Sequence, residues 1–295
     1  MTKNSNFPLE NLDSYIWLDG EFILSRDAHV HILNHSLQYG GGVFEGLRSF
    51  KGRIFKLEEH TKRLFSSANI MGLDIPYSEE YINEIHYKLL ELNNLSNAYF
   101  RPFVFRATDS IKIFPENPRT RVMISAWESA PRAAKNIKLN ISNWIKPGKN
   151  MFPPKCKASA QYGLLSTIAA DAKSKGFDDS ILLDENGFIA ECTSCNIFFI
   201  KEDKIFTPST NYCLDGITRQ TIMQIADKIG LECFVLDISP QDLGAFDSAF
   251  VSGTAAGIIE INSISYNNGL YNYLPNQYFK ELNIEYKKLT GENNE

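Results

Sequence analysis

Two lysines stand two positions apart, at Lys155 and Lys157, in the segment "MFPPKCKASAQY". Side chains two positions apart in an extended chain point to the same side, so periodicity does not distinguish them. A lysine on an open loop is a solvated cation, whereas burial or a nearby cation lowers its pKa and yields a reactive amine. Such an amine forms Schiff bases with carbonyl compounds. The segment therefore indicates either a solvated lysine pair or one lysine that bonds a carbonyl cofactor.

Other segments supply the groups that such a cofactor needs. "LDGITRQTIMQIADKIG" predicts a helix that begins after Gly216, so the N–H groups of Ile217 and Thr218 form an anion site at its N-terminus. "VSGTAAG" ends a strand in a turn of small residues, whose backbone can approach a ligand closely. Glu191 has a strand-like context and Arg63 a helical one. Each feature alone is also typical of an ordinary capped helix or solvated side chain, but together they favour pyridoxal phosphate.

Seven motifs occur in the order found in one enzyme family: "LQYGGGVFEGLRSF", "HTKRL", "AYFRPFVF", "KASAQY", "AECTSCN", "GITR" and "SGTAA". From about Tyr15 to Ala256 the sequence resembles the branched-chain aminotransferases. These share a pyridoxal-phosphate fold class with D-amino acid aminotransferases and aminodeoxychorismate lyases. The resemblance implies a class IV aminotransferase with pyridoxal 5'-phosphate as cofactor and a two-domain α+β fold of type IV, like that of D-amino acid aminotransferase.

The resemblance also distinguishes the two lysines. The family's Schiff-base lysine stands five residues before a tyrosine, and Lys157 has that spacing to Tyr162 whereas Lys155 does not. Lys157 is thus implied as the catalytic lysine, which also moves the proton between the substrate α-carbon and the cofactor. Tyr162 would hydrogen-bond the cofactor phenolate. Glu191 matches the family carboxylate that keeps the pyridine nitrogen protonated, so that the ring accepts electrons.

The remaining cofactor contacts implied by the resemblance concern the phosphate and the ring. The phosphate would be bound by Arg63, Ile217, Thr218 and Thr254. Asn196 matches a family residue close to the ring. No metal is implied.

Substrate residues are implied in the same way, and they are Tyr39, Phe44, Arg48, Tyr99, Arg101, Thr254 and Ala255. Tyr99 and the Thr254-Ala255 backbone would hold the α-carboxylate, while Phe44 and Tyr39 would form the wall of an apolar pocket. Arg101 would receive the distal carboxylate of glutamate, because one pocket must take both leucine and glutamate. Arg48 is a rival cation by its place in "VFEGLR".

Some positions depart from the family pattern. The loop "DSIKIFPENP" lacks the expected glycines and contains Lys112, another rival cation. Ser159 and Ala160 replace paired glycines, Gln161 replaces an asparagine, and Cys192 replaces a glycine. These departures leave the cofactor residues intact and concern the substrate spectrum.

The function implied is transamination between branched-chain L-amino acids (leucine, isoleucine and valine) and 2-oxoglutarate or glutamate. The alternatives in the same fold are an aminotransferase for D-amino acids or another amine, and an aminodeoxychorismate lyase. "AYFRP" argues against them, because an arginine two residues after the tyrosine is the branched-chain pattern. A non-enzymatic cofactor-binding protein is disfavoured by the retained lysine, carboxylate, tyrosine and phosphate arginine.

Local signals predict the elements that position these residues. "YIWLDGEFI" and "LRSFKGRIFKL" predict hairpins at Asp19-Gly20 and Lys51-Gly52. Apolar stripes predict one helix that stops at Gly72 and another that opens on Ser78. With the strands "AYFRPFVFRAT" and "TRVMISAWE", these elements predict a small α+β N-terminal domain over residues 1–127.

The aperiodic segment "ESAPRAAKN" predicts an interdomain linker over residues 128–136. Beyond it, the predicted strands are "IKLNISNW", "DSILLD", "NIFFI", "CFVLDIS" and "SAFVSG". "LLSTIAADAKSKG" and "TRQTIMQIADKIG" predict two helices. These elements predict a larger α+β cofactor-binding domain over residues 137–295.

Composition excludes several other classes. The net charge of −5 gives no basic surface for nucleic acid or anionic membranes, and no apolar run approaches a spanning length. The polar N-terminus does not resemble a signal peptide, so we expect a cytoplasmic protein. Cys192 and Cys195 form a lone CxxC without a second ligand pair, which disfavours a metal site. Because family sites lie near a subunit boundary, the resemblance implies a homodimer or higher homo-oligomer. Its expected partners are small molecules, namely amino acids and 2-oxo acids.

Overall fold

The secondary structure comes from a computed structural model that describes residues 11–107, 110–116, 118–129 and 136–292. The chain divides into two units. The first comprises Met1–Pro131 with Cys156–Gln161, and the second comprises Arg132–Lys155 with Tyr162–Glu295. The predicted domain limits of 1–127 and 137–295 stay a prediction, and most of the predicted linker, residues 128–136, lies outside the described residues.

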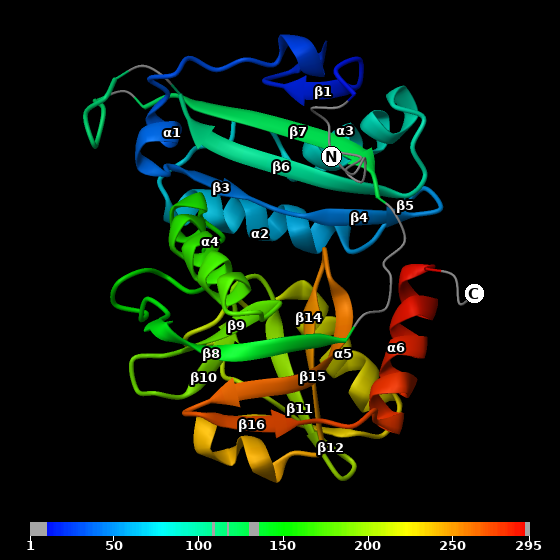
Figure 1. Cartoon of the computed structure of the whole chain (residues 1–295). Coiled ribbons are helices and arrows are strands. Elements are labelled where there is room, and N and C mark those ends of the chain that lie inside the picture. The colour runs from blue at the N-terminus through cyan, green and yellow to red at the C-terminus, as the bar shows by residue number, and fades with distance from the viewer. Residues whose placement is uncertain (1–10, 108–109, 117, 130–135, 293–295) are drawn as a thin grey trace. The chain divides into compact units, whose positions relative to one another are not determined.

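Antiparallel strands form the sheet of the first unit. Among the described residues, seven strands pair in the order β2-β1-β7-β6-β4-β5, with β3 also paired to β6. They are β1 (Tyr15–Leu18), β2 (Glu21–Leu24), β3 (Gly42–Phe44), β4 (Leu47–Phe50), β5 (Arg53–Ile54), β6 (Ala98–Arg106) and β7 (Thr120–Glu128). The long pair β6 and β7 lies at the centre (Figure 1). Both predicted hairpins are confirmed, since Asp19-Gly20 and Lys51-Gly52 join paired strands with positive φ at all four residues.

The helices of the first unit are α1 (His35–Tyr39), α2 (Leu57–Ile70) and α3 (Glu79–Leu92), with a 3-10 turn η1 at Ser25–Asp27. The predicted ends of α2 and α3 are confirmed: the Ser78 side chain caps α3, and Gly72 follows α2 with a φ of +61°. Helices α2 and α3 pack on each other, and α3 also contacts β1 and β7. Buried side chains of α3 and the strands form this core: Trp17, Ile82, Ile85, Leu89, Phe100 and Ile124.

The second unit has a mixed sheet. Nine strands of the described residues pair in the order β10-β9-β8-β15-β14-β11-β12-β13, with β16 also paired to β15. They are β8 (Ile137–Ile145), β9 (Asp179–Leu183), β10 (Ile189–Cys192), β11 (Asn196–Lys201), β12 (Lys204–Thr207), β13 (Glu232–Val235), β14 (Ser248–Gly253), β15 (Gly257–Tyr266) and β16 (Gly269–Asn272). The pairs β8–β9, β8–β15 and β12–β13 are parallel, and the others are antiparallel.

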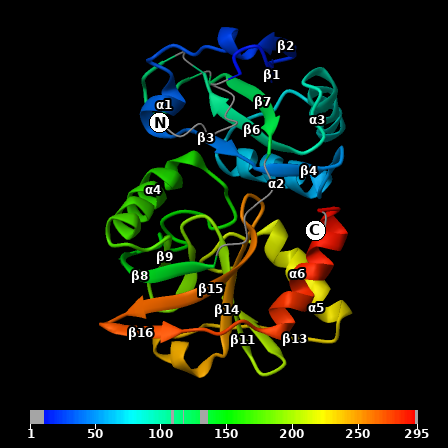
Figure 2. The same cartoon turned by 45° about the vertical axis from the view of Figure 1, so that its right-hand side comes forward.

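The helices that continue the chain are α4 (Ser159–Ser174), α5 (Ile217–Lys228) and α6 (Gln277–Thr290), with a 3-10 helix η2 at Pro240–Ala245. The boundary between the two units falls within α4. Helices α5 and α6 lie side by side in both views (Figure 2), and α5 also contacts β13 and β14. Apolar side chains of the sheet form the core of the second unit, among them Leu139, Ile181, Phe199, Val251 and Ile264.

Three further features bear on function. Within the described part of the chain, no helix has the length and apolarity needed to cross a membrane. The same residues contain no group of three or more His, Cys, Asp or Glu that could hold a metal ion. All five cysteines are free thiols.

Candidate active site

The two lysines of the segment "MFPPKCKASAQY" have different surroundings. Lys155 is exposed, whereas Lys157 is half-buried and lies just before α4. Its backbone N–H donates to the Ser67 hydroxyl at 3.1 Å, and its carbonyl accepts from the Phe44 N–H at 3.1 Å. The Lys157 ammonium lies 5.2 Å from the centre of the Phe44 ring. Both sides of the Lys157 peptide are thus fixed, and its amine is held against an aromatic face.

The Phe44 ring also brings together two predicted substrate residues. The Arg101 guanidinium lies 4.6 Å from the centre of this ring and donates to the Tyr99 hydroxyl at 3.2 Å. A side chain at Gly46 would collide with that hydroxyl, so the glycine of "VFEGLR" leaves space for Tyr99. Four predicted residues therefore form one cluster in the first unit: Phe44, Tyr99, Arg101 and Lys157.

The other predicted or rival groups of the first unit have different surroundings. Tyr39 ends α1, is 48% exposed, and donates to the Ile111 carbonyl at 2.9 Å. Arg48 is buried in β4, with its guanidinium 5.0 Å from the Phe50 ring centre. Lys112 is exposed and pairs with Glu116 at 3.3 Å. Among these cations, Arg101 is the one that the structure places on the ring that Lys157 also contacts.

Arg63, the predicted phosphate-binding residue, forms an ion pair with Glu45, a contact that was not predicted from the sequence. Its Nε and Nη2 donate to the two oxygens of Glu45 at 2.6 and 2.9 Å, and His60 Nδ1 contacts the same carboxylate at 2.8 Å. Burial favours the neutral acid, but Arg63 and His60 outweigh it and hold the pKa of Glu45 far below its usual range. We name Glu45, His60 and Arg63 the Glu45 network.

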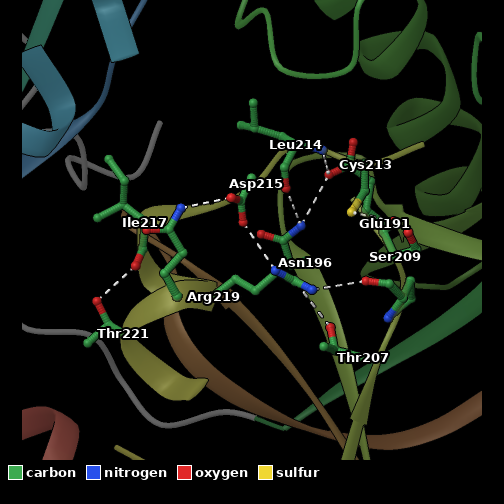
Figure 3. Close-up of polar contacts among 12 residues, drawn as sticks. Glu191, Asn196, Thr207, Ser209, Cys213, Leu214, Asp215, Ile217, Arg219 and Thr221 are labelled. Atoms are coloured by element: carbon green, nitrogen blue, oxygen red, sulfur yellow. Dashed lines mark hydrogen bonds and ion pairs between the residues drawn. The ribbon is translucent and has the colours of Figure 1, made fainter. Parts of the chain in front are cut away.

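Glu191 in β10 is the corresponding buried carboxylate of the second unit. Its Oε1 contacts the Lys146 ammonium. Its Oε2 accepts from the Leu214 backbone N–H at 3.2 Å and more weakly from Asn196 Nδ2 at 3.4 Å (Figure 3). Asn196 also donates to the Leu214 carbonyl at 2.8 Å. Burial disfavours the charge of Lys146, but Glu191 outweighs it and raises the pKa of the ammonium. We name Lys146, Glu191 and Asn196 the Glu191 network.

At the predicted phosphate site, an arginine of α5 holds the segment that precedes this helix. Arg219 is buried and donates to the Asp215 carboxylate and the Pro208 carbonyl, both at 3.1 Å (Figure 3). The N-cap is Gly216, which offers no side-chain oxygen to the N–H groups of Ile217 and Thr218. A Cβ at Gly216 would collide with the amide oxygen of Asn196, so the glycine leaves space for the Asn196 side chain. The helix start is therefore rigid and able to receive an anion.

The last predicted residues lie on α4 and on the β14–β15 turn. Tyr162 is half-buried near the start of α4 and packs against the cluster of Leu165, Ile168 and Leu182. Thr254 is half-buried and Ala255 exposed, in the tight turn that follows β14. The turn predicted from "VSGTAAG" is therefore confirmed.

The residue chemistry fits pyridoxal phosphate. An anchored lysine would supply the amine, a glycine-capped helix start would suit a phosphate, and a buried carboxylate would suit the ring nitrogen. Asn196 contacts both Glu191 and the segment that leads into α5, so these last two features are coupled within the second unit.

Comparisons with known proteins agree with this chemistry. The family model Amino-transferase class IV matches residues 42–264. A probable branched-chain-amino-acid aminotransferase of Rickettsia bellii is 43% identical over 290 residues, which cover 98% of this chain and 99% of the relative. The chain belongs to the branched-chain-amino-acid aminotransferases of class IV.

Solved structures of the T.th. branched-chain amino acid aminotransferase extend the similarity to the fold. The form with pyridoxamine 5'-phosphate has a TM-score of 0.90 and 28% identity over 95% of both chains. The complex with N-(5'-phosphopyridoxyl)-L-glutamate has a TM-score of 0.89 and 29% identity over 95% of both chains. The family, the type IV fold, the transaminase function and the pyridoxal-phosphate cofactor predicted from the sequence are thereby confirmed.

Sequence reasoning missed two residues of this aminotransferase that contact predicted site residues, Glu45 beside Arg63 and Lys146 beside Glu191. Glu45 lies inside the quoted motif "VFEGLR", so its motif position was the available signal. Lys146 stands 45 residues before Glu191 in a segment without a motif, and only the sheet brings the two together. Each residue is the partner of a predicted one.

Proposed function

We propose that this aminotransferase exchanges amino groups between leucine, isoleucine or valine and 2-oxoglutarate, with both substrates bound in turn by the same residues. The cluster around Phe44 carries the proposal, because one aromatic ring contacts both the Lys157 amine and the Arg101 cation. An apolar wall suits a branched side chain, and a cation suits the distal carboxylate of glutamate. The L-glutamate adduct of the T.th. relative is consistent with this pairing.

The proposed cofactor-binding roles are those that the family resemblance implies, and the contacts of each residue are compatible with them. When bound, pyridoxal phosphate supplies a carbonyl for the amine and a ring that withdraws electrons. Lys157 provides the amine and afterwards moves a proton at the substrate α-carbon. Glu191 keeps a proton on the ring nitrogen, and Tyr162 and Asn196 orient the ring. The phosphate is assigned to Arg63, Ile217, Thr218 and Thr254.

Substrate binding divides between the two ends of the amino acid. Tyr99 and the Thr254-Ala255 backbone bind the α-carboxylate, which all substrates share. Phe44 and Tyr39 line the apolar part of the pocket, and Arg48 supports it from β4. Arg101 binds the distal carboxylate that glutamate has and leucine lacks. Burying that carboxylate without a cation would cost several kcal/mol, about the cost of an unpaired buried ion.

The test compares Arg101→Leu with the parent enzyme in separate half-reactions. We expect glutamate and 2-oxoglutarate to lose about two to three decades in specificity, because a buried charge pair is broken. Leucine should lose less than about tenfold, since only a pocket wall changes. Lys112→Ala is the matched control and should leave both substrates unchanged. Equal losses for leucine and glutamate would remove Arg101 from the substrate site.

A donor panel distinguishes the same-fold alternatives. L- and D-leucine and L- and D-alanine are each offered with 2-oxoglutarate. L- and D-glutamate are offered with the 2-oxo acid of leucine, because glutamate and 2-oxoglutarate exchange amino groups without net change. The proposal predicts turnover of the L-amino acids, with L-leucine well ahead of L-alanine. A preference for the D-enantiomers would instead identify a D-amino acid aminotransferase.

We further propose a homodimer. Eight large apolar residues of the first unit are 48–82% exposed on two segments: Val30, Ile32, Leu33, Leu37, Tyr39, Ile111, Ile113 and Phe114. Hydrogen bonds of His35 to the Ile113 carbonyl and of Tyr39 to the Ile111 carbonyl join these segments. Exposed apolar surface of this kind is typical of protein interfaces. Light scattering should give twice the chain mass; an active monomer would contradict the proposal.

The proposed location is the cytoplasm. Five free thiols fit a reducing compartment better than an oxidising one. Fractionation of the source cells, followed by immunodetection, should find the protein with cytoplasmic markers.

A further inference from the structure

Lys146 is a buried cation that none of the roles above uses. It follows β8, and its backbone N–H donates to the Leu183 carbonyl of β9 at 2.8 Å. In the register of the sheet, Leu182 stands opposite Glu191 of β10. The ammonium contacts Glu191, and the two side chains are only 5% and 9% exposed. The sheet itself therefore fixes the pair.

The surroundings of Lys146 leave Glu191 as its anion. Among the residues that the structure describes, three titratable groups face it: Glu191 from β10, Cys213 from the segment before α5, and Tyr162 from α4. Burial raises the pKa of the Cys213 thiol to about 12, so this group is neutral at physiological pH. Removing Lys146 would leave Glu191 buried with dipolar donors, which in the described part of the chain are the Leu214 N–H and the Asn196 amide.

We propose that Lys146 is a positioning residue that keeps Glu191 ionised, so that the proton shared with the cofactor's ring nitrogen stays on the nitrogen. The inference rests on the proposed role of Glu191. According to this proposal, Lys146 controls whether the ring nitrogen is protonated, although Lys146 itself would contact only the carboxylate.

The reason is the balance between two arrangements of one proton. With the proton on nitrogen, the pair is a pyridinium and a carboxylate; with the proton on oxygen, it is a neutral pyridine and a carboxylic acid. Burial favours the neutral arrangement, because both charges lose solvation. Lys146 contacts the carboxylate directly. A pyridinium that shares a proton with Glu191 would meet Lys146 only through this carboxylate, so Lys146 would stabilise the carboxylate more than it would repel the pyridinium. The ionic arrangement, in which the ring accepts electrons, therefore prevails.

The experiment measures the ring nitrogen directly. The parent enzyme, Lys146→Met and Lys146→Arg are loaded with pyridoxal phosphate isotopically labelled at the ring nitrogen, and its NMR shift is recorded. Lys149→Met is the matched control, because Lys149 is an exposed lysine three residues further along. We expect a protonated nitrogen in the parent, in Lys146→Arg and in Lys149→Met, and a neutral nitrogen in Lys146→Met. The half-reaction of Lys146→Met with L-leucine should slow at least about tenfold, and arginine should restore it.

A protonated nitrogen in Lys146→Met would overturn the inference. Glu191→Gln separates this failure from that of the proposed function: if Glu191→Gln also keeps the proton, the assigned role of Glu191 is wrong. If Glu191→Gln loses the proton and Lys146→Met keeps it, only the inference on Lys146 is wrong.

The double variant Lys146→Met/Glu191→Gln covers the case in which Lys146→Met does not fold, because it removes both buried charges together. In the Glu191→Gln background, Lys146→Met should leave the nitrogen shift and the leucine rate unchanged. A further loss would show that Lys146 acts independently of Glu191, which contradicts the proposal.

Discussion

The two units each bury one carboxylate, and the two networks satisfy it differently. Glu45 is completely buried and receives two hydrogen bonds from Arg63 and one contact from His60. Glu191 has Lys146 on one oxygen, and on the other a backbone N–H and a long amide contact. The first carboxylate faces a rigid fork that stays charged, and the second faces a flexible ammonium.

The difference indicates different tasks. An arginine cannot lose its proton in a protein, so the Glu45 network is a permanent ion pair that joins β3–β4 to α2. A buried lysine can become neutral when its partner is removed, so the Glu191 network tolerates a change of charge. We therefore expect Glu45 to matter for stability and Glu191 for the rate of transamination.

The largest effect is expected for Glu45→Gln. It leaves the Arg63 charge without its carboxylate, which should lower the free energy of unfolding by about 3–5 kcal/mol. Denaturant unfolding of the apoprotein at fixed protein concentration measures this loss. A stability within about 1 kcal/mol of the parent would show that the Glu45 network is not a structural ion pair.

Glu191→Gln should have the opposite profile. Because Lys146 can release its proton, the stability loss should be smaller than for Glu45→Gln. The half-reaction with L-leucine should slow by about a hundred- to a thousandfold, the usual effect of losing one preorganised electrostatic contact. Single-turnover kinetics give the rate. A variant as fast as the parent would mean that another acid serves the ring nitrogen.

A smaller effect concerns the pH dependence of the Glu45 network. Burial lowers the pKa of His60, although Glu45 opposes this. The unfolded chain then binds the proton more readily, so the contribution of His60 to stability is complete above about pH 6.5 and is lost as the pH falls. Each pH unit below that value should cost up to about 1.4 kcal/mol until the folded histidine also protonates.

Chemical unfolding between pH 7 and pH 5 (about the range in which histidine titrates) measures this slope. His60→Gln should flatten it relative to the parent, and His29→Gln, at an exposed histidine, should not. Identical slopes in all three proteins would show that His60 does not couple stability to pH.

Turn and capping residues predicted much of the fold. Two helices were not predicted: one is too short for a periodic pattern, and the capping residues of the other were overlooked. Asp19-Gly20 and Ser78 act within their own turns, so sequence alone locates them. Helix α1 has only five residues, too few for a periodic pattern. Helix α6 has a cap at Asn276 and a left-handed Gly291 at its end, a signal that sequence reasoning overlooked.

In the candidate site, too, local contacts could be predicted from the sequence and long-range contacts could not. Lys157 and Tyr162 are close in sequence, so their spacing carried the assignment. The Lys146–Glu191 contact depends on the pairing of β8, β9 and β10, and no local pattern encodes that register. The contact of Arg101 with Phe44 likewise depends on how β3 pairs with β6.

The most direct test of the account is to locate the lysine that bonds the cofactor. Borohydride reduction makes this bond permanent, and proteolysis with mass spectrometry then identifies the labelled peptide and residue. We predict the label on Lys157, its absence from Lys157→Ala, and normal labelling and activity in Lys155→Ala. Label on Lys155, or an active and labelled Lys157→Ala enzyme, would contradict the assignment.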